Sequence, residues 1–234
     1  MTNEQLALLP LWYVAFLLSL TCHEAAHALA AKWGGDLTAY YSGQVTLNPL
    51  PHMQREMFGT VIVPLLTYLM GGSMLGWGSA PYDPFWEQRH PRKAAGMALA
   101  GPVANFLLAI AAGAAIHVGL ATGAFHLPGG LGFTRLADGA EGSAFEGLAR
   151  FLSILFSLNL LLGVFNLLPV APLDGHSVLG LFLPEGVHLR WLEFIRQPMP
   201  SLIGLLLAWR AFDTLFWPVF AAGVRLLHFN QFFH

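Results

Sequence analysis

The chain of 234 residues is 56% hydrophobic and only 10% charged, with a net charge of −2 at pH 7. Soluble domains carry about a quarter charged residues, so this composition excludes an ordinary soluble protein and indicates an integral membrane protein. The net charge provides no basic surface for nucleic acid, and a single cysteine, Cys22, excludes an intramolecular disulfide bond.

The first apolar stretch, residues 6–32, is long enough to cross a membrane and ends at a pair of glycines. The chain before it lacks the basic residues of a signal peptide, so we expect this helix to be retained. Residues 36–56 are polar and rich in turn formers. We expect them to lie at the membrane face and to form short strands at residues 38–41 and 44–47.

The first predicted span contains His23, Glu24 and His27 in the spacing His-Glu-x-x-His. Positions i and i+4 share one face of a helix, so the two histidines can bind one metal ion while Glu24 stands beside it as a general base. Ionisable groups inside a spanning helix are costly. We therefore interpret the motif as functional and not as a polar cluster that stabilises helix packing.

The second apolar block, residues 57–77, contains a proline and a Gly-Gly-Ser interruption. It is either a full crossing or a re-entrant element. A polar loop with three basic residues leads to a third block, residues 94–122, whose alanines and glycines allow close helix approach. We assign Gly101, Pro102 and Asn105 in this block to helix packing.

A glycine-rich loop, residues 124–146, precedes the fourth and most continuous apolar block, residues 148–168. A polar link at residues 176–197 then leads to the last apolar block, residues 200–229. Pro218 in this block favours one kinked span followed by a second short or interfacial helix. Arg210 and Asp213 are expected to pair at i,i+3 within their helix.

Asp174 is the candidate for a third metal ligand, because a catalytic zinc site usually has three protein ligands. It follows a run with two prolines that stops the fourth helix, where its carboxylate can turn back toward the interior of the bundle. A bound zinc ion would neutralise its charge and offset the desolvation of the site.

The motif His23-Glu24-x-x-His27, with Asn166 and Leu173-Asp174-Gly175 at the end of a later span, resembles the site-2 protease family of intramembrane zinc metallopeptidases. The resemblance covers about residues 17–179 and is to the compact members without a PDZ or CBS domain. Four further segments carry it: residues 43–52, 59–64, 101–105 and 165–169. Two departures from the family pattern are Met53-Gln54 after His52, and His176 after Asp-Gly.

By this resemblance, His23, His27 and Asp174 would bind one zinc ion per chain, Glu24 would be the catalytic base, and Asn166 would help to hold the substrate strand. The implied activity is that of a zinc endopeptidase. It would hydrolyse a peptide bond in or near a transmembrane segment of a membrane protein, with zinc-activated water. The expected partners are that substrate and the lipid bilayer, in the cytoplasmic membrane of a bacterium.

The three proposed ligands can share one zinc ion only if they lie at similar depth in the membrane. The helices at residues 6–32 and 148–168 must then run in the same direction, which requires that the block at residues 57–77 be re-entrant. Arg55, Arg89 and Lys93 would then all face the cytoplasm, as the positive-inside rule prefers. We expect an external N-terminus, a metal site in the cytoplasmic leaflet, and a substrate strand that pairs with residues 40–47.

The sequence therefore predicts an all-α multi-pass membrane protein with a three-helix catalytic core, a re-entrant element, membrane-face strands and C-terminal helices. We expect residues 1–234 to form a single membrane-embedded domain, with its core at about 6–180 and the C-terminal helices at about 190–230. The main alternative to a peptidase is a membrane metal-ion transporter that uses His, Glu and Asp ligands. A third possibility is a scaffold that retains zinc for structure, and the oligomeric state stays open.

Overall fold

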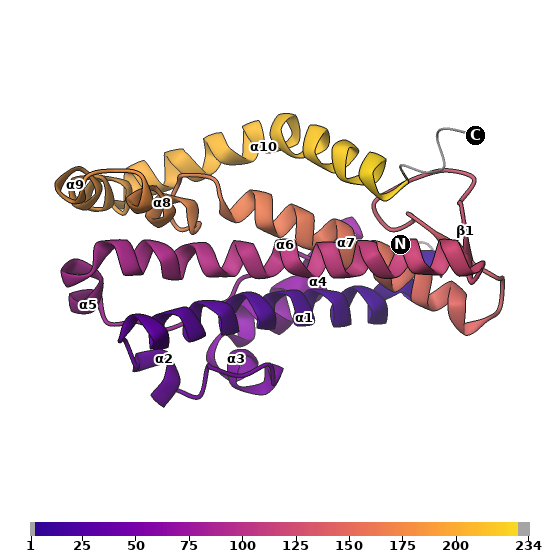
Figure 1. Cartoon of the computed structure of the whole chain (residues 1–234), viewed down its shortest axis with the longest axis horizontal. Coiled ribbons are helices and arrows are strands. Elements are labelled where there is room, and N and C mark those ends of the chain that lie inside the picture. The colour runs from indigo at the N-terminus through magenta and orange to yellow at the C-terminus, as the bar shows by residue number, and fades with distance from the viewer. Residues whose placement is uncertain (1–2, 229–234) are drawn as a thin grey trace.

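The computed structural model describes residues 3–228, which form a bundle of helices (Figure 1). Within this range, four helices are long and apolar enough to cross a membrane: α1 (Asn3–Gly34), α6 (Pro91–Thr122), α7 (Ala144–Asn166) and α10 (Pro198–Leu227). They run along the long axis of the molecule, and α1, α6 and α7 pack against one another. The predicted all-α multi-pass class and the three-helix core are confirmed.

Small residues bring the core helices together. A Cβ atom on Gly163 of α7 would lie 2.9 Å from the ring of Phe106 on α6, and one on Gly113 of α6 would lie 3.2 Å from Phe156 on α7. Glycine at these two positions lets each aromatic ring pack directly on the opposing backbone. The close helix approach expected from the composition of residues 94–122 is thus present.

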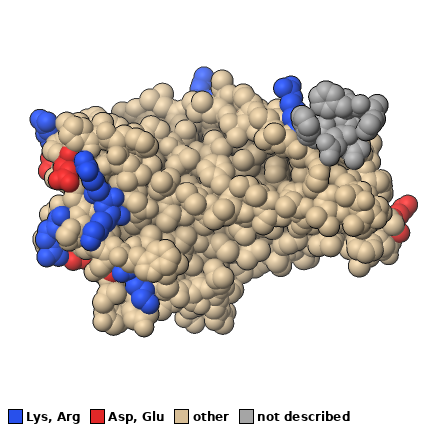
Figure 2. All heavy atoms as spheres, viewed as in Figure 1, with Lys and Arg blue, Asp and Glu red and all other residues tan. Residues whose placement is uncertain are grey.

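Charged side chains are concentrated at the ends of the bundle. Figure 2 shows basic and acidic groups at the end that carries α5 (Pro84–Arg89) and α9 (Glu185–Ile195), and a long flank with very few charges. An apolar flank with charged ends is the surface expected of a protein that lies across a bilayer. The chain is accordingly a multi-pass membrane protein.

Residues 56–79 form a hairpin that enters the bundle and returns. The π-helix η1 (Phe58–Ile62) continues into α4 (Val63–Gly71), which ends at Gly72 with a left-handed φ of 74°. The chain then runs back along this helical segment: Leu75 N donates to Thr67 Oγ1 (2.9 Å) and Trp77 N donates to Gly59 O (3.1 Å). With 5 and 9 residues, η1 and α4 rise only about 21 Å, less than the about 30 Å of a hydrocarbon core.

The two ends of this hairpin are tied together. Ser79 Oγ donates to Glu56 Oε1 (2.5 Å), and Arg55 Nε donates to Ser79 O (3.0 Å). Residues 55 and 79 therefore lie at the same end of the bundle. The re-entrant interpretation of residues 57–77 is confirmed, and a full crossing by this block is excluded.

The prediction of membrane-face strands at residues 38–41 and 44–47 is wrong. The first segment is the short helix α2 (Thr38–Tyr41), and the second forms no strand. Asp36 Oδ1 accepts hydrogen bonds from Thr38 N (2.9 Å) and Thr38 Oγ1 (2.6 Å), and Gln44 N donates to Ala39 O (2.9 Å). These local bonds use the backbone groups that a strand would need for pairing.

Two other short segments of the described chain are extended and paired. β1 (Phe125–His126) and β2 (Asp138–Gly139) form an antiparallel pair in the loop between α6 and α7. The same loop inserts Phe133 into the bundle, where its ring stacks on Trp12 (centroids 5.6 Å apart) and on Phe220 (6.0 Å). The loop therefore packs against both the first and the last long helix.

The C-terminal part is more helical than expected. The supposed polar link at residues 176–197 contains most of α8 (Gly175–Val178), η2 (Leu179–Leu181) and α9. The last block is one continuous helix, α10, so the second helix expected after it is absent from the described residues, whereas the expected kink is present as a bend of the α10 axis (Figure 1). On either side of Phe216, the rings of Phe212 and Phe220 on the same helix lie 5.3 and 5.6 Å away between centroids, so the aromatic packing continues past Pro218.

Candidate metal centre

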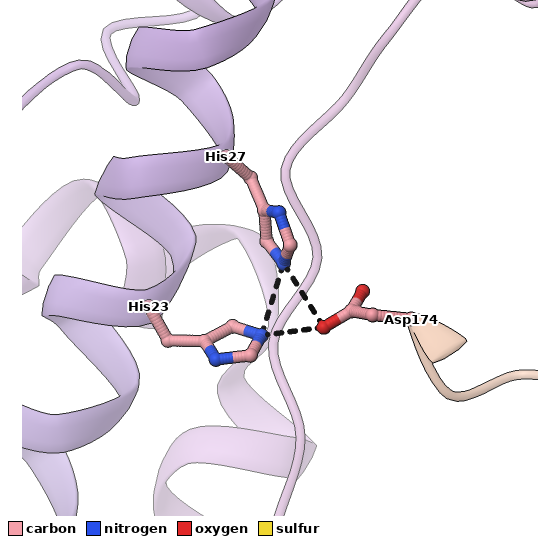
Figure 3. A group of neighbouring side chains, drawn as sticks. All are labelled: His23, His27 and Asp174. Carbon is pink, nitrogen blue, oxygen red and sulfur yellow. Dashed lines mark hydrogen bonds and ion pairs between the residues drawn. The ribbon is translucent and has the colours of Figure 1, made fainter. Parts of the chain in front are cut away.

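The structure brings His23, His27 and Asp174 together (Figure 3). Nε2 of His23 lies 2.9 Å from Nε2 of His27, and Asp174 Oδ2 lies 3.1 and 3.3 Å from these two nitrogens. The histidines are on α1, one turn apart, whereas Asp174 comes from the loop between α7 and α8. Both histidines are buried, with 5% and 6% of their surface exposed.

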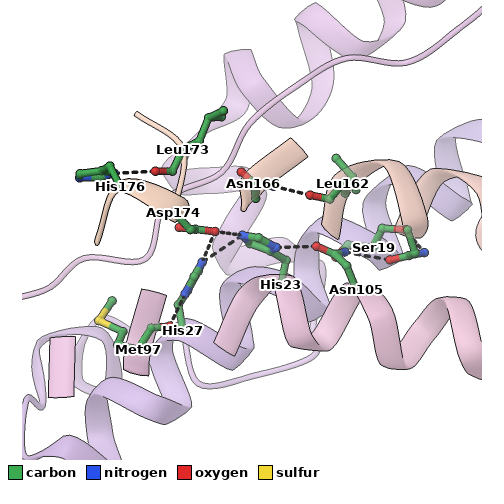
Figure 4. Close-up of polar contacts among 11 residues, drawn as sticks. Ser19, His23, His27, Met97, Asn105, Leu162, Asn166, Leu173, Asp174 and His176 are labelled. Carbon is green, nitrogen blue, oxygen red and sulfur yellow. Dashed lines mark hydrogen bonds and ion pairs between the residues drawn. The ribbon is translucent and has the colours of Figure 1, made fainter. Parts of the chain in front are cut away.

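In each imidazole, the partner of Nδ1, the nitrogen that faces away from Asp174, defines the tautomer of the ring. His27 Nδ1 lies 2.8 Å from the carbonyl oxygen of Met97, and His23 Nδ1 lies 2.6 Å from Asn105 Oδ1 (Figure 4). Both oxygens can only accept, so each Nδ1 carries the proton and donates it. In the neutral ring, each Nε2 therefore presents a lone pair toward Asp174.

The donor set fits a metal ion. Two imidazole nitrogens and one carboxylate oxygen face one another at 2.9 to 3.3 Å. Asp174 Oδ2 is buried and receives no hydrogen bond from the described part of the chain. With both rings neutral, a metal ion among the three atoms offsets the repulsion between the two nitrogen lone pairs and the carboxylate, and imidazole nitrogen with carboxylate oxygen is a typical zinc donor set.

A polar network behind His23 was missed by sequence reasoning. Asn105 Nδ2 donates to Asn159 Oδ1 (2.8 Å), and Asn159 Nδ2 donates to Ser19 Oγ (2.8 Å). The three side chains come from α6, α7 and α1 and are fully buried. Asn105, assigned to helix packing above, thus orients a proposed ligand. Ser19 lies four residues before His23 on the same helix face, and this polar residue in an apolar helix was the signal in the sequence that pointed to the network.

Gly101 lets α6 pass directly beside the two histidines. A Cβ atom at this position would lie 2.4 Å from His27 Nε2 and 2.6 Å from His23 Nε2. No side chain larger than hydrogen fits there unless the rings move. Gly101 therefore serves helix packing, as expected, and also leaves the space that the two histidine rings need.

A second network holds the loop that carries Asp174. His176 Nδ1 donates to Leu173 O (2.5 Å), and its Nε2 accepts a hydrogen bond from Arg196 Nε (3.0 Å). Trp191 Nε1 donates to His176 O (3.0 Å). Burial, the largest effect, lowers the pKa of His176, which favours the neutral ring that this pattern requires.

Arg196 continues this network to the opposite wall of the site. Its two terminal nitrogens donate to Glu87 of α5 at 2.7 and 2.8 Å, in a bidentate ion pair. The side chain of Glu87 is 7% exposed, so this arginine compensates a buried charge. His176, which departs from the family pattern, therefore connects the loop of Asp174 through Arg196 to α5 and to the end of α9.

A cavity of about 530 Å³ opens beside the ligand cluster and is lined by Glu24, Asn166 and Asp174, among others. Glu24 is only 4% exposed and packs against Gly78, where a Cβ atom would lie 2.9 Å from its Oε1. No residue within 3–228 donates a hydrogen bond to the Glu24 carboxylate. It is therefore free to accept a proton from a water molecule in the cavity.

Asn166, the predicted substrate-binding residue, lies at the end of α7 on the wall of the cavity. Its Nδ2 donates to Leu162 O (3.1 Å) in its own helix (Figure 4). Its Oδ1 accepts no hydrogen bond from the described residues. This oxygen remains available to a ligand in the cavity.

Residues 11–190 of the chain match the model of a protein family described as Peptidase family M50. The chain is 34% identical over 190 residues to "Putative zinc metalloprotease YwhC" of Bacillus subtilis (strain 168), which covers 78% of this chain and 74% of that protein. It is 32% identical over 165 residues to "Putative zinc metalloprotease Rip2" of Mycolicibacterium smegmatis, covering 70% of this chain and 54% of that relative. No solved structure matches the chain.

Proposed function

The chain belongs to peptidase family M50, the site-2 protease family, and from this premise we propose that it cleaves membrane proteins inside the bilayer. It is a zinc metalloprotease of the cell membrane. Specifically, we propose that it hydrolyses a peptide bond in or near a transmembrane segment of its substrate. The observation that carries it is the meeting of His23, His27 and Asp174 beside Glu24, in a cavity enclosed by apolar helices.

In this proposal, His23, His27 and Asp174 hold one zinc ion. Asn105 and the Met97 carbonyl keep both Nδ1 protons away from the centre, so that both Nε2 lone pairs are directed toward the ion. When bound, zinc supplies a Lewis acid that polarises a peptide carbonyl and makes a nearby water more acidic.

Glu24 acts as the proton carrier. Its carboxylate accepts a proton from a cavity water as that water attacks the peptide carbonyl, and returns a proton to the departing amine. Its low exposure and its packing on Gly78 restrict its movement, which favours both transfers. Asn166 Oδ1 accepts a hydrogen bond from a backbone N–H group of the substrate.

The substrate strand is better accommodated by residues 76–80 than by residues 40–47, which form a helical turn and the coil after it. Residues 76–80 are non-helical and line the cavity next to Glu24. Their backbone can pair with a substrate segment that has unwound. This returning arm of the re-entrant hairpin thus replaces the pairing site expected from the sequence.

We also propose that residues 1–234 act as one membrane-embedded domain, with a core at about 6–180 and C-terminal helices at about 190–230. Metal transport, the alternative raised by the sequence, is supported less well by residues 3–228. In the described part of the chain, His, Cys, Asp and Glu side chains form one group able to hold a metal. A carrier would need further ligands across the membrane.

The test compares wild type with Glu24→Gln, co-expressed with candidate single-span membrane proteins, and uses mass spectrometry to identify fragments. We expect the variant to lose cleavage while it retains about one zinc ion per chain, because Glu24 is not a ligand. Glu141→Gln, in the loop between α6 and α7, is the matched control and should cleave normally. Cleavage by Glu24→Gln at the wild-type rate would refute the role of this residue. If neither protein cleaved and the variant still performed the cellular function of the wild type, a structural zinc scaffold would be favoured.

A further inference from the structure

Arg210 and Asp213 lie in the middle of α10, on its outer surface. With a rise of about 1.5 Å per residue, they are about 18 and 22 Å from the start of a helix about 45 Å long. Both side chains are exposed. A hydrocarbon core of about 30 Å that is centred on this helix includes both of them. Two charged groups therefore point toward lipid near the depth where charge is least tolerated.

Neither group has a partner within residues 3–228. The structure contains no ion pair between Arg210 and Asp213, so the pairing at i,i+3 expected from the sequence is wrong. Figure 2 shows two well-separated basic groups along the edge that α10 forms, one of them over the middle of this helix. The cost of these two charges in lipid is left uncompensated by the single chain.

The two charges belong to a broader exposed face. At 100° per residue, Arg210 and Asp213 project from the same side of α10 as Ile203, Leu206 and Trp217. These three apolar side chains are 50%, 59% and 51% exposed. The face therefore has apolar side chains above and below a charged centre.

We propose that this face of α10 is a homodimer interface, in which Arg210 of each copy pairs with Asp213 of the partner subunit. The face carries one positive and one negative group about 4.5 Å apart along the helix axis. Two parallel copies related by a two-fold axis along the membrane normal bring each arginine opposite the other copy's aspartate. The long arginine side chain spans the offset in depth.

A second copy fits this face better than an unrelated helix does. A partner helix with one charge would neutralise Arg210 or Asp213 and leave the other in lipid. The same chain supplies both opposite charges with an offset of only about 4.5 Å in depth, so two reciprocal ion pairs form and the net charge at the interface is zero. α1, with His23 and His27, lies on the other side of the bundle (Figure 1), so each copy keeps its own metal centre.

The test measures association between two differently tagged copies that are expressed together and purified in mild detergent. We expect wild-type copies to co-purify. Arg210→Asp gives a face with two acidic groups and Asp213→Arg gives a face with two basic groups, so each variant should lose association with itself by at least tenfold. An Arg210→Asp copy expressed with an Asp213→Arg copy should recover association to near the wild-type level.

The mixed pair separates the proposal from misfolding, because only folded copies with complementary faces can recover. Arg225→Asp, a charge reversal in the last turn of the same helix, is the matched control and should associate as wild type does. The proposal is overturned by wild-type copies that do not co-purify, by single variants that self-associate normally, or by a mixed pair that does not recover.

Discussion

Asn105 Oδ1 accepts a hydrogen bond from Nδ1 of His23 at 2.6 Å, across 82 residues of sequence. The same asparagine donates to Asn159, which donates to Ser19, so that three core helices share one buried network that ends at a proposed metal ligand. The orientation of the His23 ring therefore depends on how α1, α6 and α7 pack. This relationship gives the first prediction.

Asn105→Ala should weaken zinc binding by about 10- to 100-fold, because His23 loses the acceptor that fixes its ring and its tautomer. The measurement is zinc retained by the purified protein against a competing chelator. Asn166→Ala is the control: it should leave zinc affinity unchanged and raise the KM for cleavage. Wild-type zinc affinity in Asn105→Ala would contradict an orienting role for this network.

Gly101→Ala should abolish zinc binding and lower stability by about 1 to 3 kcal/mol, because the new Cβ atom overlaps both imidazoles at 2.4 and 2.6 Å. Zinc content and the thermal unfolding midpoint would be measured together. Gly96→Ala, on the same helix, provides the comparison, since nothing lies within 4 Å of its Cβ position. Equal zinc content in the two variants would show that the histidines are arranged differently.

Arg196→Met should destabilise the site by about 1 to 3 kcal/mol, because it leaves the Glu87 carboxylate buried and unpaired and removes a donor from His176. The loop of Asp174 would then be less restrained, and zinc affinity should fall. Arg196→Lys should recover only part of the loss, since lysine cannot form the bidentate pair.

Arg190→Met on α9 serves as the reference for this change, because Arg190 is exposed and, among residues 3–228, its side chain bonds only to the Gly186 carbonyl of its own helix. Adding Glu87→Gln to Arg196→Met should recover stability relative to Arg196→Met alone, since it removes the unpaired charge. A double variant that is less stable than Arg196→Met would argue against the ion pair as the cause.

The re-entrant hairpin predicts that both of its flanks face the same side of the membrane. Single cysteines at Gln54 and Gln88, introduced into a Cys22→Ser background, should react with a membrane-impermeant reagent from the same side. A cysteine at Glu141, in the loop between α6 and α7, should react only from the other side. Labelling of Gln54 and Gln88 from opposite sides is incompatible with the hairpin.

Sequence alone was sufficient for the features that depend on local geometry or on membrane thickness. His23 and His27 share a helix face because of their i,i+4 spacing, and the apolar lengths limit which segments can cross. The requirement of equal depth for His23, His27 and Asp174 also led to the re-entrant hairpin. Each of these inferences needs only the period of the α-helix or the length of an apolar segment relative to the thickness of the membrane.

Only the tertiary structure decided the contacts between distant segments. Ser19 and Asn159 are 140 residues apart, and Glu87 and Arg196 are 109 apart, so their pairing follows from helix packing and not from any local pattern. Local bonds from Asp36 turned a predicted strand into a helix, and the outward direction of Arg210 and Asp213 emerged only once the packed face of α10 was known. The sequence thus determined which groups could form the metal centre, and packing determined which groups hold them in position.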